Sequence, residues 1–300
     1  MDRQANAPNL PDWLSPLLVR EIRQDLRANQ FAGLFLTLHA IALASFGLEM
    51  AAGQLVEQTG ILRIGTGGIL NLPLFLFFGL IFPGAQLTAL QPETGPGRNI
   101  ELLAVSNLSR WQVVRDKWLS GMSLSILALI SLLPYFLIQP LIGKGSFSEA
   151  LSSIVFLAEL NIFTTAIFLG ASGFRSYLVR AILIIFYLIT FAISLMLLKT
   201  GPDAAKGSLL IRDLAGLLCE GLFILLALQL GRSKLQIGRN PLEPPSSALI
   251  LLITFCCPVL IGCSNQLLSQ WGGWIAAGLV AVGLLFLERD KGTKRTIQKA

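Results

Sequence analysis

The chain has 300 residues, of which 54% are apolar and only 13% are Asp, Glu, Lys or Arg, and its net charge is +6. Globular chains carry about 25% charged residues, so this composition, with a mean hydropathy of +0.69, places most of the chain in lipid. It excludes a soluble enzyme, a disulfide-stapled secreted domain and a disordered protein. In a membrane protein the positive charge reports topology, and we expect no nucleic-acid partner.

Residues 1–30 precede the first apolar run and are expected to form a cytoplasmic tail that ends in an amphipathic helix. Ser15 followed by Pro16 is a typical helix start, because the first turn leaves its N–H groups unbonded anyway. A helix with arginines beside an apolar stripe would lie flat among the lipid head groups. The alternative is an ordinary basic flank of the first span. The stripe positions recur every four residues: Leu14, Leu18, Ile22 and Leu26.

Eight apolar runs follow, each close to the roughly 20 residues that span a bilayer core of about 30 Å. They predict an all-α, polytopic membrane helix bundle. A Pro-rich segment at 240–247 divides a six-span core, 31–240, from a C-terminal two-span hairpin with a basic tail, 241–300. Prolines inside the runs predict kinks whose freed carbonyls are satisfied by neighbouring helices. The predicted spans are 31–52, 68–90, 118–142, 150–172, 177–198, 209–231, 247–265 and 270–288.

The distribution of basic residues predicts the orientation of these spans. With the N-terminus in the cytoplasm, 18 of the 23 Lys and Arg fall on the cytoplasmic side and five fall on the outer side. Cytoplasmic loops of membrane proteins carry this excess of positive charge. We therefore expect a multi-pass protein of the bacterial cytoplasmic (inner) membrane with both termini in the cytoplasm.

The sequence offers no catalytic, cofactor or metal site. It lacks the GxxxxGK motif that cradles nucleotide phosphates. Its one histidine, His39, cannot supply the ligand set that holds a metal ion in an intramembrane metalloprotease. We expect a non-enzymatic chain, with any energy supplied by a partner or by an ion gradient.

The segment 91–117, between the second and third spans, contains turn and helix signals that a simple connecting loop does not require. It opens with a Gly/Pro turn, continues as a short helix near residues 100–105 and breaks at Ser106 and Asn107. Ser109, with Gln112 three residues later, predicts the start of the helix that leads into the third span. Apolar residues interleaved with arginines predict a docking surface, although a solvated connector is the plainer alternative.

Two parts of the sequence, PLLVREIRQ at 16–24 and NIELLAVSNLSRWQVV at 99–114, resemble the permease subunits of type-2 ABC transporters. The resemblance covers residues 12–120 and the rest by topology. It implies that the N-terminal helix is an interfacial connecting helix and that the loop after the second span is a coupling helix. The positions that would face the ATPase are Glu101, Leu102, Leu103, Ser106, Leu108 and Arg110.

The resemblance also implies partners. A cytoplasmic ATP-binding cassette subunit would bind ATP and Mg²⁺, and a second permease chain, identical or homologous, would complete the transporter. This chain would then carry no cofactor of its own, and transport would be export. The family core has six spans, so the last two are expected to be an appended hairpin.

Three carboxylates fall inside predicted spans: Glu159, Asp213 and Glu220. A charged carboxylate at the bilayer centre costs about 3 kcal/mol on insertion scales, so these groups are expected to face protein or water. They predict either a polar lining of the transport path or hydrogen bonds that hold helices together. The alternative function is an ion-coupled secondary transporter that uses these carboxylates.

Overall fold

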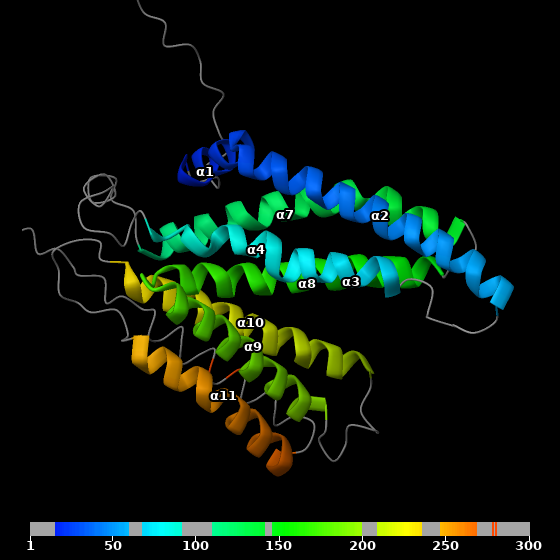
Figure 1. The fold of residues 1–300 in the computed structure, drawn as a ribbon. Coiled ribbons are helices and arrows are strands. Elements are labelled where there is room, and N and C mark those ends of the chain that lie inside the picture. The colour runs from blue at the N-terminus through cyan, green and yellow to red at the C-terminus, as the bar shows by residue number, and fades with distance from the viewer. Residues whose placement is uncertain are drawn as a thin grey trace, which may run out of the picture.

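The computed structural model describes residues 16–59, 68–91, 110–141, 146–199, 209–235 and 247–268, together with positions 278 and 280. These residues form helices and no strand (Figure 1). Two short irregular turns, a π-helix at Phe77–Ile81 and a 3₁₀-helix η2 at Ala85–Thr88, interrupt the second span. The α-helices are α1 (Pro16–Arg27), α2 (Asn29–Thr59), α3 (Gly68–Leu76), α4 (Phe82–Gly84), α7 (Arg110–Leu141), α8 (Phe147–Ser172), α9 (Tyr177–Lys199), α10 (Leu209–Lys234) and α11 (Ser247–Leu268).

Six stretches of the described chain are long and apolar enough to cross a membrane, so the protein is a multi-pass membrane protein. The apolar part of α11, Ser247–Cys263, is shorter than these six. The predicted eighth span, 270–288, lies outside the described residues except at positions 278 and 280, so the count of eight stays a prediction. The six stretches are Asn29–Leu48, Asn71–Thr88, Arg110–Ile138, Phe147–Ser172, Tyr177–Leu197 and Leu214–Lys234.

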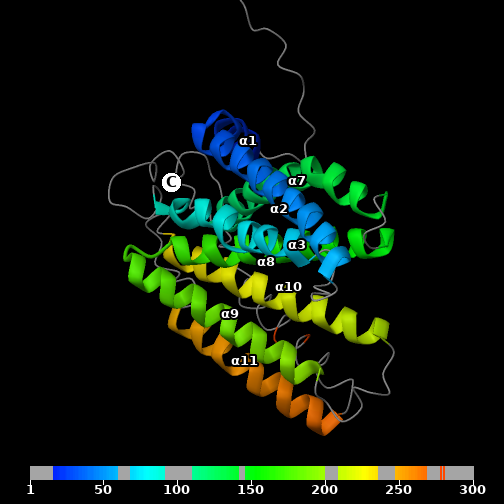
Figure 2. The same cartoon turned by 45° about the vertical axis from the view of Figure 1, so that its right-hand side comes forward.

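The helices pack in layers, with α8 in the middle (Figures 1 and 2). On one side α8 packs against α7, which in turn packs against α2; on the other side it packs against α10. Beyond α10 lie α9 and α11, which pack against each other. Because α8 contacts both halves, its last third is buried almost completely, from Phe163 to Gly173.

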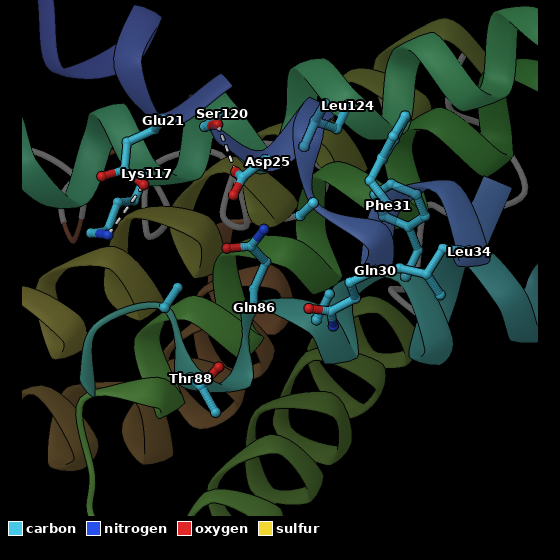
Figure 3. A pocket seen from close by; sticks show the side chains of 14 residues that line it. Glu21, Asp25, Gln30, Phe31, Leu34, Gln86, Thr88, Lys117, Ser120 and Leu124 are labelled. Atoms are coloured by element: carbon cyan, nitrogen blue, oxygen red, sulfur yellow. Dashed lines mark hydrogen bonds and ion pairs between the residues drawn. The ribbon is translucent and has the colours of Figure 1, made fainter. Parts of the chain in front are cut away.

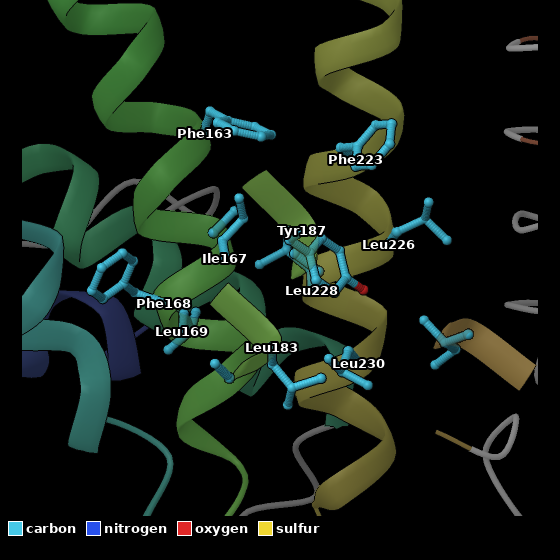
Figure 4. Close-up of a cluster of buried hydrophobic side chains, with 14 of the residues drawn as sticks. Phe163, Ile167, Phe168, Leu169, Leu183, Tyr187, Phe223, Leu226, Leu228 and Leu230 are labelled. Carbon is cyan, nitrogen blue, oxygen red and sulfur yellow. The ribbon is translucent and has the colours of Figure 1, made fainter. Parts of the chain in front are cut away.

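Two apolar cores flank α8. One joins α2, the second span and α7 around Phe77, Phe78 and Leu132. The other joins α8, α9, α10 and α11 and contains the aromatic rings of Phe163, Tyr187 and Phe223 (Figure 4). Phe191 lies with its ring centroid 4.1 Å from Phe163 and 5.5 Å from Phe223. Such offset and edge-on pairs are the favoured geometry of packed aromatic rings.

The second span is broken where its sequence contains Pro83. The backbone widens into a π-turn just before this residue, and the N–H of Phe82 donates to the carbonyl of Phe77. The next bond of that pattern would come from the nitrogen of Pro83, which carries no hydrogen, so the carbonyl of Phe78 loses its partner within the helix. From α8, the side-chain nitrogen of Asn161 donates to this carbonyl at 3.1 Å, and Thr164 adds a longer bond. The predicted repair of a proline break by a neighbouring helix is confirmed here.

A close backbone approach joins α8 to α10. A Cβ atom placed on Gly170 would lie 2.3 Å from the carbonyl oxygen of Ala227, and one placed on Gly231 would lie 3.4 Å from the Cα of Gly170. Small residues at such positions let two helices pack at short range inside a membrane. This contact fixes α10 against the buried part of α8.

One end of the bundle collects most of the described positive charge. It holds α1, η2, the start of α7, the α8–α9 turn and the end of α10, and it is called the basic end below (Figure 1). The cationic side chains there are Arg20, Arg23, Arg27, Arg110, Arg115, Lys117, Arg175, Arg180, Arg232 and Lys234.

Candidate functional site

At the basic end, α1 is fixed to the start of α7 by polar contacts (Figure 3). Lys117 Nζ lies 3.5 Å from Glu21 Oε2, and the hydroxyl of Ser120 donates to Asp25 Oδ2 at 3.2 Å. Lys117 and Ser120 are both buried. The helix therefore presents its acidic face to the bundle and leaves arginines, among them Arg23, exposed.

The predicted apolar stripe of α1 is used only in part. The helix begins at Pro16, as its missing N–H predicts. Leu18 is buried, Ile22 is half-buried and Leu26 is 44% exposed, while Leu14 lies outside the described residues. The side chains that face the bundle thus alternate between apolar and acidic, and the position of the helix among lipid head groups stays a prediction.

Asp25 occupies an unfavourable place for a negative charge. Burial raises its pKa above the ordinary value, and the neighbouring charge of Glu21 raises it further. The hydrogen bond from Ser120 and the positive charge of Lys117 lower the pKa, but they do not offset burial. The carboxylate is therefore only partly compensated by the groups around it.

Arg180 is the largest fully buried side chain of the described residues, and it ties the second span to the α8–α9 turn. Its Nε donates to the carbonyl of Phe174 at 2.6 Å, and its Nη1 donates to the carbonyl of Leu87 at 2.9 Å. A third bond runs from Nη2 to the carbonyl of Arg175. With its amide oxygen turned toward the guanidinium, Gln91 accepts from Nη1 at 2.8 Å and also from Nη2. One side chain therefore holds the backbone just before the predicted coupling segment.

The two flanks of that segment are both anchored in the bundle. On the first flank, the N–H of Leu90 donates to the hydroxyl of Ser172 at 3.3 Å. On the second, Val113 and Val114 are fully buried, and the indole of Trp118 donates to the carbonyl of Ile162 at 3.3 Å. The segment between them is thus attached at both ends to α8, the central helix.

Most of the predicted coupling residues lie outside the described part of the chain: Glu101, Leu102, Leu103, Ser106 and Leu108. Arg110 is described, half-buried, as the first residue of α7. Within the described residues α7 starts at Arg110, eight residues before the predicted third span at 118, and Ser109, its predicted cap residue, lies outside them.

A cavity of about 260 Å³ opens between α1, the start of α2, η2 and α7 (Figure 3). Its polar wall carries Glu21, Asp25 and Lys117, and its apolar wall carries Phe31 and Leu34 from the first turns of α2. Gln86, Thr88 and Ser120 add hydrogen-bonding groups. The cavity is therefore charged toward the basic end and apolar toward the bundle interior.

The predicted intramembrane carboxylates are brought together in part. Glu159 lies midway along α8 and Glu220 midway along α10; both are half-buried, and the charge of Glu159 acts on Glu220. Asp213 belongs to α10, but its side chain lies outside the described part. Glu159 and Glu220 thus place two half-buried carboxylates on α8 and α10, which pack against each other.

Sequence reasoning missed Arg180, Asp25 and Lys117 as site residues and counted the two cations only as topology signals. No local motif marks them, because each acquires its role from a partner far along the chain. Among the described residues, no three His, Cys, Asp or Glu side chains gather as a metal site would require. No family model, curated protein or solved structure matches the chain.

Proposed function

We propose that the chain is the membrane permease subunit of an ABC transporter of the bacterial cytoplasmic membrane. A separate cytoplasmic ATP-binding cassette subunit would bind ATP and Mg²⁺, and a second permease chain would complete the path. The chain itself performs no bond chemistry, takes no nucleic acid and moves its substrate outward. The basic end faces the cytoplasm in this proposal, in line with the excess of positive charge on cytoplasmic loops.

One observation carries the proposal. The segment that resembles a coupling helix is attached at both flanks to the bundle, through Leu90 and Gln91 on one side and Val113 on the other. Because both flanks are attached, a movement of this segment would be transmitted to α8 and α9. Beside it, α1 is fixed to α7 through Lys117, as a connecting helix would be.

Site-directed photo-crosslinking tests the docking surface. A photoreactive residue at Leu102, Leu103 or Leu108 is expected to capture a protein with an ATP-binding cassette, identified by its phosphate-binding loop. The matched control places the same residue at Leu36, which lies on α2 and is 70% exposed on the lipid-facing surface. Capture of no cassette protein from the three loop positions would contradict the proposal.

A second candidate function rests on Glu159 and Glu220, whose charges interact in the middle of the bundle. In an ion-coupled secondary transporter these carboxylates would bind and release the driving ion. Glu159→Gln and Glu220→Gln would then abolish pH-dependent transport in liposomes that contain no ATPase. Transport that needs ATP and survives both substitutions would exclude this candidate.

A further inference from the structure

The cavity at the basic end has the layout of a binding site for an amphiphile. Its charged wall lies at the end of the bundle, while Phe31 and Leu34 belong to the first turns of the apolar stretch that starts at Asn29. The boundary between head groups and acyl chains falls at this level of a spanning helix. A lipid could therefore place its head against the charged wall and its chains along α2.

The charge of the wall selects the head group. Glu21 and Asp25 supply two carboxylates and Lys117 supplies one ammonium, which is already paired with Glu21. The other oxygen of Glu21 lies 3.4 Å from the exposed Arg20, so the less compensated carboxylate of the wall is Asp25, which accepts a hydrogen bond from Ser120. A primary ammonium offers three N–H donors and a positive charge to this carboxylate.

The cavity walls also offer donors for a phosphate. The side chains of Gln86 and Thr88 both line the cavity, and the amide of Gln86 points toward Asp25 (Figure 3). The volume of about 260 Å³ lies just below the roughly 300–1,000 Å³ of pockets for drug-sized ligands. It suits a head group and the beginning of its chains rather than a whole lipid.

We propose that this cavity binds a phospholipid with a primary ammonium head group, of the phosphatidylethanolamine type, with the ammonium against Asp25. The bound head group would contact η2 and α7, which flank residues 92–109, and would brace α1 against both. This inference needs the membrane topology of the chain but not the ABC proposal. It holds for any function the bundle performs.

A head-group series tests the proposal on the full-length protein. The protein is purified in mild detergent and equilibrated with equal amounts of phosphatidylethanolamine, its N-methylated forms, phosphatidylcholine and phosphatidylglycerol with the same acyl chains. Native mass spectrometry then counts the retained lipids. We expect retention to fall as methyl groups replace the N–H donors, with phosphatidylethanolamine ahead of phosphatidylglycerol. Equal retention across the methylation series, or preference for phosphatidylglycerol, would overturn the proposal.

Variants then place the lipid in this cavity. Asp25→Asn should lower the preference for phosphatidylethanolamine about ten-fold, the effect of one charge-assisted hydrogen bond. Arg23→Gln, which changes an exposed charge on the same helix, should keep the preference. Leu34→Trp should fill the cavity and displace the lipid, whereas Leu36→Trp, on the exposed side of α2, should not. The same retention in the two tryptophan variants would exclude this cavity as the site.

Discussion

Asn161 on α8 donates a hydrogen bond of 3.1 Å to the carbonyl of Phe78, the group that Pro83 leaves without a donor in its own helix. Both residues are buried, so no water replaces the bond. The pair fixes the irregular middle of the second span to the central helix, and it makes the broken helix compatible with a membrane.

Asn161→Leu is expected to destabilise the protein by about 1–2 kcal/mol, because it leaves this buried carbonyl with only the longer bond from Thr164. Pro83→Ala supplies the missing N–H, so the cost of Asn161→Leu should shrink in the double variant. Thermal unfolding of the four proteins in detergent measures the coupling. Equal costs with and without Pro83 would show that the bond does not repair the proline break.

Gly170→Val is expected to destabilise the bundle by about 1–3 kcal/mol or more, since its Cβ would lie 2.3 Å from the carbonyl oxygen of Ala227. Gly33→Ala is the matched control, because nothing lies within 4 Å of the added atom. Alanine favours helix over glycine, so this control should be neutral or slightly stabilising. Unfolding temperatures of the two variants decide the comparison, and equal values would contradict the close packing of α8 on α10.

Arg180→Met should cost at least about 2 kcal/mol, because three main-chain carbonyls lose a buried donor. Arg180→Lys keeps the charge but not the forked geometry, so its effect should be intermediate. Arg175→Met removes an exposed side chain of the same turn and is expected to have little effect. Thermal unfolding checks the order of the three variants; a harmless Arg180→Met would refute the anchoring role.

The raised pKa of Asp25 predicts a pH-dependent effect of Asp25→Asn in delipidated detergent. A raised folded-state pKa means that protonation stabilises the fold; this contribution is complete below the unfolded value near 3.8 and is lost as pH rises through the folded pKa. At neutral pH the ionised carboxylate of Asp25 therefore destabilises the folded state, although Lys117 on α7 attracts it.

Asp25→Asn, which can still accept from Ser120, should raise the unfolding temperature at pH 7, and the gain should shrink as pH falls. Arg27→Gln serves as the control, because an arginine stays charged over this range. A gain that stays unchanged from pH 7 down to about pH 3.8 would contradict the raised pKa.

Local and periodic features of the fold could be predicted from the sequence. Run lengths predict the apolar helices, and Pro16 is the first described residue of α1. The contacts of Arg180 could not be predicted, because its acceptors include Leu87, which lies 93 positions away. The orientation of α1 could not be predicted either: Leu18 of the four-residue stripe is buried, but Glu21, which lies outside the stripe, also contacts the bundle.

The central claim, that this chain works with a cytoplasmic ATPase, is tested most directly by purification in mild detergent, identification of co-purifying chains and assay of ATP hydrolysis. The account predicts a soluble ATP-binding cassette subunit and ATPase activity in the preparation, both lost when Leu102, Leu103 and Leu108 are changed to alanine. Transport-competent protein that purifies alone and hydrolyses no ATP would contradict it and would favour ion coupling through Glu159 and Glu220.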